Sequence, residues 1–225
     1  MPTNSEKLFS EVVLERRATK DFEPTPVPDE DLKKILSAGL RAPSANNLQP
    51  WRFVVVRDSE QRKRLRVAAM NQPKIEAAPV VIVACGDPTG WKNGDMEQMI
   101  SDGGAHGTID DAAAAAIRKS VSGYLGGTPG DGGGNAPDWG IWTTRQTMIA
   151  FTTMMWAAET LGYDTAPMEG FFESKVKETL GIPDHVRVIA LLTIGHKRGE
   201  DRPFGGRFPM ERTAFDNAWG KGIKL

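Results

Sequence analysis

The spacing of apolar residues predicts several helices. The longest covers residues 143–161, where apolar side chains occupy most faces, so this helix should lie at the centre of the fold. Asp29 resembles a helix N-cap, and the apolar stripe that follows it should end at Pro43. Further helices are predicted at residues 5–16, 110–122 and 173–180.

Short runs rich in β-branched residues predict strands. They cover residues 53–56, 80–84 and 186–195. The chain has few strands, several helices and no steady strand–helix alternation, which argues against a doubly wound parallel sheet. The pattern therefore predicts an α+β fold.

The composition changes between residues 86 and 140. Glycine clusters lie at 103–104, 126–127 and 132–134, and glycine is costly to order and has no side chain to pack. Within this stretch only residues 110–122, with five consecutive alanines, predict a helix. We therefore expect one domain over residues 1–225 that carries a glycine-rich insertion or lid at about residues 86–140.

Composition and charge exclude several classes of protein. The formal net charge of −1 gives no general attraction for nucleic acid or for an anionic membrane. Cys85 is the only cysteine, which excludes an intrachain disulfide and a cysteine-rich metal or iron–sulfur site. The three histidines lack paired ligand spacing, so no metal site is predicted. No signal-peptide core or membrane span is visible, and a cytoplasmic location is the expectation.

The common nucleotide-binding motifs are also missing. No G-x-G-x-x-G follows a strand and no P-loop sequence occurs, so a Rossmann site or a P-loop is not expected. What remains is a basic segment at residues 15–22 and a loop at residues 42–53 that is rich in small and amide side chains. The basic residues could simply interact with a helix C-terminus. The amides suit recognition of a heterocycle edge or a polyol, although a plain turn would use the same residues.

Taken in order, these segments resemble the nitroreductase family. The motif R-R-x-x-[RK]-x-F stands at residues 16–22, and P-S-x-x-N-x-Q-P-W-x-F stands at residues 43–53. Asn71 and Lys74 follow, then the P-x-x-G-F element at residues 167–171, then Arg207. Each piece alone is weak, but their ordered combination is specific.

The resemblance implies FMN as the cofactor and assigns roles by position. The phosphate would be held by Arg16 and Arg207, and Lys20 would lie near the flavin N1–C2=O side. Asn71 and Lys74 would bond the pyrimidine edge. The cofactor-binding positions implied in this way are Arg16, Arg17, Ala18, Lys20, Pro43, Ser44, Ala45, Asn47, Gln49, Asn71, Lys74, Pro167, Met168, Glu169, Gly170 and Arg207. Ser44 and Asn47 would contact the ribityl chain or ring, and backbone N–H groups at Glu169 and Gly170 would approach N5.

Ala18 replaces a commoner serine, which removes one hydroxyl contact. No catalytic side chain and no metal is implied, because the cofactor carries the chemistry.

The family fold implied is a mostly antiparallel sheet flanked by helices, with a long buried central helix. The resemblance also implies an intertwined homodimer with FMN at the subunit interface and a C-terminal arm at about residues 205–225. Phe215, Trp219 and Ile223 suit such an arm because a free tail would expose them, although a terminal helix packed on its own subunit fits equally well.

The implied reaction is a ping-pong transfer of hydride from NAD(P)H to FMN and then of electrons to a nitroaromatic, quinone or similar acceptor. The aromatic and methionine side chains of the insertion could roof a flat substrate; they are Trp91, Met96, Met99, Tyr124, Trp139 and Trp142. Two alternatives stay open. Glu97 and Tyr124 offer a superficial match to the lid of family members that reductively dehalogenate halotyrosines, and a flavin-binding module without efficient turnover would use the same cofactor residues.

Overall fold

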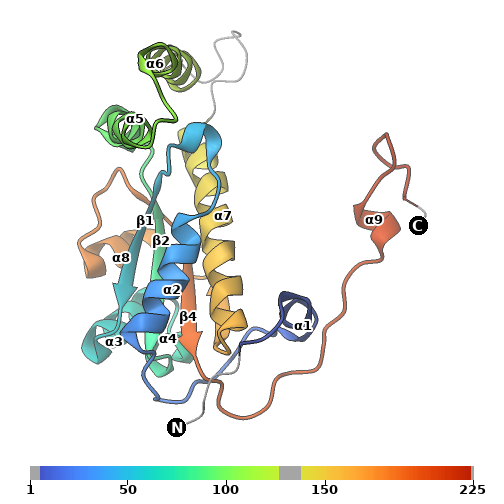
Figure 1. Cartoon of the computed structure of the whole chain (residues 1–225). Coiled ribbons are helices and arrows are strands. Elements are labelled where there is room, and N and C mark those ends of the chain that lie inside the picture. The colour runs from blue at the N-terminus through green and yellow to red at the C-terminus, as the bar shows by residue number, and fades with distance from the viewer. Residues whose placement is uncertain (1–5, 127–137, 224–225) are drawn as a thin grey trace.

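A four-stranded antiparallel sheet forms the centre of the protein (Figure 1). The computed structural model describes residues 6–126 and 138–223. The strand order is β1-β2-β4-β3, with β1 at Trp51–Val56, β2 at Val80–Gly86, β3 at Asp164–Met168 and β4 at Arg187–Gly195. The predicted α+β class is therefore confirmed, as is the mostly antiparallel sheet.

Both faces of the sheet are buried, and the period of two along β2 separates them. Val80, Ile82 and Ala84 belong to one apolar core. Val81, Val83 and Cys85 belong to the other. This is why the run at residues 80–84 is continuously apolar and gives a strong strand signal.

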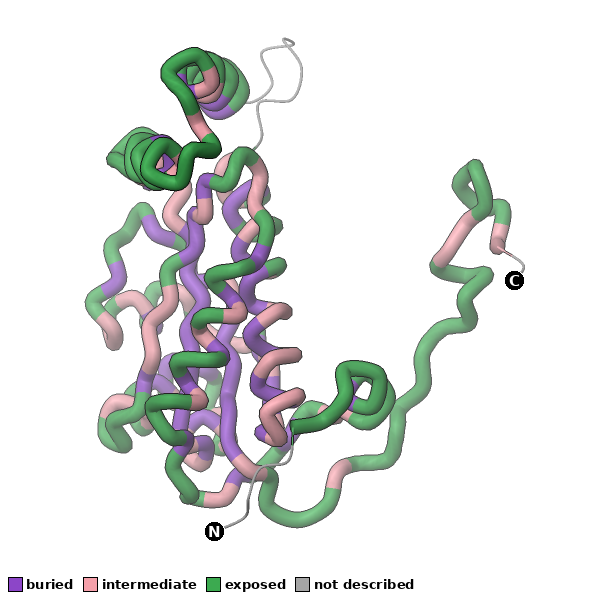
Figure 2. Tube along the Cα trace, viewed as in Figure 1, coloured by how far each residue is buried: buried purple, intermediate pink, exposed green. Residues whose placement is uncertain are grey.

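Helices cover the two faces in separate layers, and the buried strands between them stand out in Figure 2. One core contains residues of α2 (Asp29–Leu40) and α7 (Trp139–Thr160). The other contains residues of α3 (Ser59–Ala68), α4 (Pro73–Ala77) and α8 (Glu173–Leu180). The 22-residue helix α7 is the central helix predicted from its apolar faces. None of the described helices has the length and apolar character needed to span a bilayer.

The helix α1 (Phe9–Glu15) lies beside the C-terminal end of α7. The Phe9 and Trp156 rings meet edge to face with centroids 5.6 Å apart. The Lys7 amide donates to the Thr160 carbonyl at 2.8 Å. Leu14 on the outer face of α1 is 75% exposed, so the described residues leave an apolar face of this helix uncovered.

The C-terminal segment stands away from the body of the subunit (Figure 1). It carries α9 (Met210–Thr213) and an isolated bridge between Phe215 and Gly222. Trp219 is 92% exposed. No terminal helix packed on its own subunit is seen in the described part of this tail, and the assignment of the tail as an arm stays a prediction.

The insertion contains more helix than its glycines suggest. Besides α6 (Asp111–Leu125) and a 3₁₀ turn, η2 (Gly90–Lys92), the structure has α5 (Asp95–Ala105). The expectation of a single helix in this stretch was therefore wrong. Gly103 lies in α5, and a Cβ there would meet Ile109 Cδ1 at 2.3 Å, so this glycine permits close packing rather than marking a loop. The cluster at 132–134 lies outside the described residues.

Several predicted boundaries shift for identifiable reasons. Helix α1 begins at Phe9 because the Leu8 amide is already bonded to Glu11 Oε2 at 3.0 Å; residue 5 lies outside the described residues. Helix α7 begins four residues early, since Asp138 Oδ1 accepts from the Ile141 amide at 3.0 Å. Asp29 is the first residue of α2 rather than its N-cap. Strand β3 and helices α3 and α4 were not predicted.

Candidate functional site

Three of the predicted cofactor segments meet around β3. Ala18 forms a parallel bridge with Thr165, and the Thr19 amide donates to the Thr165 carbonyl at 3.0 Å. Gln72 Nε2 donates to the Gly170 carbonyl at 2.8 Å. The fold therefore brings residues 16–20, 71–74 and 166–170 to one place, although they are far apart in sequence.

Arg16 carries an unsatisfied donor at this place. Its Nη1 is buried and has no hydrogen-bond partner among the described residues. Its guanidinium lies 5.9 Å from the centre of the Trp156 ring. It also borders a cavity of about 50 Å³ whose other lining residues include Glu159 and Lys197. Because a buried donor without an acceptor is costly, this nitrogen suits an oxyanion supplied by a ligand.

Two lysines add positive charge without carboxylate partners. Burial lowers the pKa of Lys74, and the nearby Lys20 ammonium lowers the same pKa further. Neither lysine forms a salt bridge within residues 6–126 and 138–223. Asn71 precedes α4 in the left-handed region with a φ of 55°, and its carbonyl accepts from Arg66 Nε at 3.3 Å. A bound anion would relieve the repulsion between the two lysines.

The segment that follows β3 makes a close backbone approach. Pro167 and Met168 are the last two residues of β3, and the exposed Glu169 follows. A Cβ at Gly170 would lie 3.2 Å from Gln72 Nε2, tighter than an ordinary contact. Glycine therefore suits this position because the backbone passes directly beside Gln72.

The loop after α2 is held in a tight conformation. Ser44 Oγ accepts from the Gln49 amide at 3.0 Å. The turn η1 (Ala45–Asn47) follows, and the φ angles of Asn46, Asn47 and Gln49 are 52°, 54° and 45°. Side chains other than glycine adopt such angles rarely, so this loop stores backbone strain at a candidate site.

This loop lies apart from the other three segments. The Ala45 amide donates at 2.8 Å to Oε1 of Gln146, which stands in the first turns of α7. Residues 16–20 follow α1, which lies beside the C-terminal end of α7 (Figure 1). The Arg16 guanidinium there faces the Trp156 ring. Within a single subunit, the predicted cofactor residues of this loop therefore lie apart from the other predicted cofactor residues. The loop residues are Pro43, Ser44, Ala45, Asn47 and Gln49.

The two other predicted arginines meet at Phe204. The guanidinium of Arg17 lies 4.7 Å from this ring and that of Arg207 lies 5.3 Å from it. Arg17 Nη1 also donates to the carbonyls of residues 14, 15 and 16, so it interacts with the C-terminus of α1. Arg17 therefore caps α1 in this structure. Its part in cofactor binding and the phosphate role of Arg207 stay predictions.

Sequence reasoning missed a buried acid beside the site. Glu159, near the end of α7, is only 6% exposed, and burial raises its pKa to about 7. Thr165 Oγ1 donates to Glu159 Oε1 at 2.6 Å. The sequence could have indicated Glu159, because it is a lone carboxylate in an otherwise apolar central helix. Nothing in the sequence indicated Gln72 and Gln146, whose amide side chains hold two of the segments in place.

The insertion residues divide between packing and exposure. Met99 and Trp142 are buried in a small core of the insertion, and the Trp91 and Trp139 rings stack with centroids 6.0 Å apart. Tyr124 is 39% exposed. Among the alternatives for substrate contact, Glu97 is already engaged by Arg118 through bonds of 2.9 and 2.7 Å.

Metal-ligating side chains are dispersed in the described part of the chain, and the thiol of Cys85 is buried. No group of three or more histidine, cysteine, aspartate or glutamate residues there could hold a metal ion. Burial raises the pKa of Cys85 to about 12, so the thiolate needed for nucleophilic attack is scarce at neutral pH.

Comparison with known proteins agrees with this arrangement. The model of the nitroreductase family matches residues 13–196. A protein of Thermus thermophilus named NADH dehydrogenase is 35% identical over 199 residues, which cover 88% of this chain and 91% of the relative. A crystal structure of a candidate nitroreductase from Exiguobacterium sibiricum, in complex with FMN, has a TM-score of 0.84 and 25% identity, covering 94% of this chain and 98% of that one. The candidate nitroreductase ydfN of Bacillus subtilis has a TM-score of 0.81 and 27% identity, covering 92% and 97%.

The fold and these matches together define an oxidoreductase. The chain belongs to the nitroreductase family.

Proposed function

We propose that this protein is an FMN-dependent reductase that takes hydride from NAD(P)H and passes electrons to a nitroaromatic, a quinone or a similar acceptor. The observation that carries the proposal is the cationic cluster of Arg16, Lys20 and Lys74 around β3. Its buried Arg16 nitrogen has no acceptor among the described residues, and its lysines have no carboxylate partner there. The FMN present in the Exiguobacterium structure supports the choice of cofactor.

The residues present fit FMN in charge and in polarity. Arg16, together with Arg207, would hold the phosphate through charge-assisted hydrogen bonds. Lys20 and Lys74 would face the flavin ring, where positive charge favours its reduced form. Asn71 would bond the pyrimidine edge. When bound, FMN would supply the redox chemistry, accepting hydride from the nicotinamide and then reducing the second substrate.

The contribution of the protein side chains is to bind and orient. The close approach at Gly170 would place backbone N–H groups beside the ring, and Gln72 fixes that backbone through its 2.8 Å bond to the Gly170 carbonyl. No side-chain nucleophile is needed. A ping-pong order follows if both substrates use the same side of the ring in turn.

We further propose a homodimer whose site is shared between subunits. The strained loop at residues 43–49 would contribute Ser44 and Asn47 to the site of the partner. Two observations support this arrangement: the loop and the cationic cluster lie by opposite ends of α7, and the tail stands away from its own subunit (Figure 1). The exposed apolar face of α1 and the exposed Trp219 would then be covered by the partner.

Absorption spectroscopy tests the proposed function. The purified protein should show a flavin spectrum, or acquire one with FMN, and the spectrum should bleach when NADH or NADPH is added without oxygen. Lys74→Met should weaken FMN binding, whereas the matched variant Lys63→Met, whose lysine pairs with Glu60 away from the site, should not. A protein that stays colourless with FMN would refute the proposal. A flavin that neither nicotinamide bleaches would refute the reductase activity but leave flavin binding intact.

A further inference from the structure

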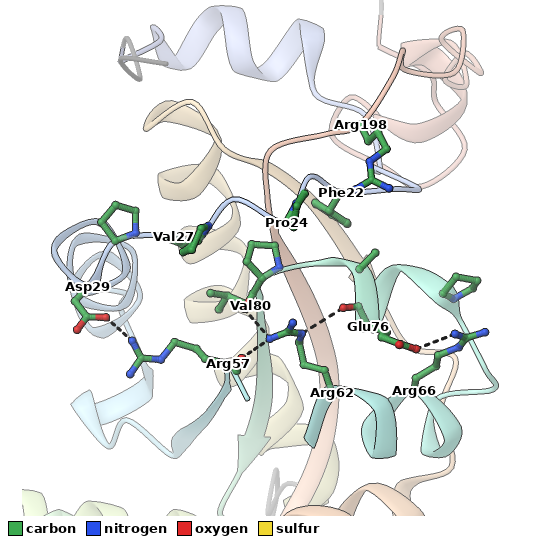
Figure 3. A pocket seen from close by; sticks show the side chains of 15 residues that line it. Phe22, Pro24, Val27, Asp29, Arg57, Arg62, Arg66, Glu76, Val80 and Arg198 are labelled. Atoms are coloured by element: carbon green, nitrogen blue, oxygen red, sulfur yellow. Dashed lines mark hydrogen bonds and ion pairs between the residues drawn. The ribbon is translucent and has the colours of Figure 1, made fainter. Parts of the chain in front are cut away.

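One cavity lies away from the residues proposed to hold FMN. It has a volume of about 840 Å³, within the range of roughly 300–1,000 Å³ typical of small-molecule sites. It opens where β1 ends and β2 begins, between α3, α4 and the extended segment at residues 22–28 (Figure 3). None of the predicted cofactor residues lines it.

The residues that line the cavity carry more positive than negative charge. Its lining includes the four arginines Arg57, Arg62, Arg66 and Arg198 but only two carboxylates, Asp29 and Glu76. Arg57 is paired with Asp29, and Arg66 Nη1 lies 2.9 Å from Glu76 Oε2. Arg198 also lines the cavity, and its Nε lies 3.4 Å from Oε1 of Glu23 in the extended segment at residues 22–28.

Arg62 differs from the other three. It has no carboxylate within salt-bridge distance in the part of the chain that the structure describes, and it lies between Arg57 and Arg66 in Figure 3. Its Nε donates to the Glu76 carbonyl at 3.3 Å, and its Nη1 donates to the carbonyls of Pro79, at 3.2 Å, and Arg57. These bonds fix the guanidinium and leave Nη2 with no acceptor among the described residues. Burial also lowers the pKa of Arg62.

The wall of the cavity is polar and apolar in similar measure. Phe22, Val27 and Val80 are buried at its edge. Five prolines with rigid pyrrolidine rings also line it: Pro24, Pro26, Pro28, Pro73 and Pro79. A fully inorganic ion would leave this apolar surface uncovered, whereas a ligand with an apolar body would bury it.

We propose that this cavity is a second ligand site, which binds a small organic anion with its carboxylate or phosphate on Arg62 and its apolar body against the proline-lined wall. The fixed guanidinium of Arg62 can donate charge-assisted hydrogen bonds to an oxyanion through Nη2, the nitrogen that its backbone contacts leave free. The neighbouring Arg57 and Arg66 would add charge on either side. The proposal is independent of the flavin chemistry, because it concerns a cavity that shares no residue with the predicted FMN set.

Calorimetric titration of the full-length protein saturated with FMN tests the site. The probes are benzoate, phenyl phosphate and the neutral benzyl alcohol. We expect at least one anion to bind and the alcohol to bind at least about tenfold more weakly, since a charge-assisted bond is lost. Binding of benzoate alone assigns the site to carboxylates, and binding of phenyl phosphate alone assigns it to phosphate esters. Equal binding of the alcohol, or no binding of either anion, would overturn the proposal.

Matched variants locate the binding. Arg62→Gln should weaken the anion about tenfold or more, whereas Arg64→Gln should leave it unchanged. Arg64 is a suitable control because it lies on the same helix, bonds Gln61 and does not line the cavity. Both variants replace an arginine with glutamine and therefore change the net charge equally. Equal affinities in the two variants would place the anion elsewhere, for example over the flavin, and would overturn the proposal.

Arg62 also supports three backbone carbonyls, so its replacement could unfold the chain. Circular dichroism checks this, and Arg57→Gln then takes its place, because Arg57 lines the cavity with a side chain that is 54% exposed. A several-fold weaker affinity in Arg57→Gln supports the site, and an unchanged affinity contradicts it.

Discussion

Replacing Glu159 with glutamine should make the protein more stable at neutral and alkaline pH. The carboxyl is 6% exposed, and its burial outweighs the hydrogen bond from Thr165 in setting the pKa at about 7. The charged groups around it are known from the structure: Asp164 raises this pKa and Arg16 lowers it, and Lys197, Lys7, Glu15, Arg17 and Asp201 line the same small cavity. Glutamine keeps an oxygen that can accept from Thr165 but cannot ionise.

The magnitude follows from the difference in pKa between the two states. In the unfolded chain Glu159 should titrate near 4.5 and in the folded protein near 7. Below the unfolded pKa of 4.5 the carboxyl is protonated in both states and does not lower the free energy of unfolding. As the pH rises the unfolded chain releases the proton first, so the free energy of unfolding falls until the pH passes the folded value. The full loss is about 3 kcal/mol, at about 1.4 kcal/mol per pKa unit.

Urea unfolding followed by circular dichroism measures this effect at several pH values. The gain in stability of Glu159→Gln over the natural chain should be near zero at about pH 4.5 and approach 3 kcal/mol at about pH 8. Glu178→Gln, which changes an exposed acid on α8, should show no such trend. A gain that is the same at all pH values would refute the reasoning, because it would show that Glu159 does not titrate in this window.

Three further predictions concern binding and packing. Arg16→Met should weaken FMN binding by roughly tenfold or more in a fluorescence titration, and Arg64→Met should not. Gln146→Ala should cost about 1 kcal/mol of stability and lower activity by loosening the loop at residue 45, whereas the neighbouring exposed Arg145→Ala should do neither. Gly86→Ala should cost about 1–3 kcal/mol in thermal unfolding, since its Cβ would lie 2.2 Å from Thr143 Cγ2.

The buried elements were predictable because each carries its own periodic signal. The run at residues 80–84 is apolar at every position because both of its faces are covered. Helix α8 was predicted with its observed bounds, Glu173–Leu180, and it ends at Gly181, which adopts the left-handed conformation with a φ of 66°.

The missed elements have weak signals for physical reasons. Strand β3 contains Pro167, which is tolerated because β3 lies at the edge of the sheet and one side needs no ladder bond. Helix α3 is rich in charge and buries only Leu65 and Ala68, so it shows no broad apolar stripe. Helix α5 was hidden by Gly103, whose lack of a side chain serves contact with Ile109.

The site was predictable as a set of residues but not as an arrangement. The ordered motifs named the segments, yet only the tertiary pairing of Ala18 with Thr165 and of Gln72 with Gly170 shows that three of them meet. The isolation of the loop at residues 43–49 depends on the path of α2 and α7, which local sequence does not specify. The sequence did not indicate Arg62 as a site residue, because its cavity is assembled from four separate parts of the chain.

The distance between this loop and the cationic cluster has a genetic consequence. If each site takes its loop from one subunit and its arginine and lysines from the other, two different defective chains can repair each other. A chain altered at Arg16 and a chain altered at Ser44 would form mixed dimers in which one site carries both lesions and the other carries none. In an equal mixture about half of the dimers are mixed, so about a quarter of the activity should return from two inactive parents. Conversely, when a defective chain is expressed beside the normal one, activity should fall only in proportion to the fraction of defective chains. No dominant-negative effect is expected.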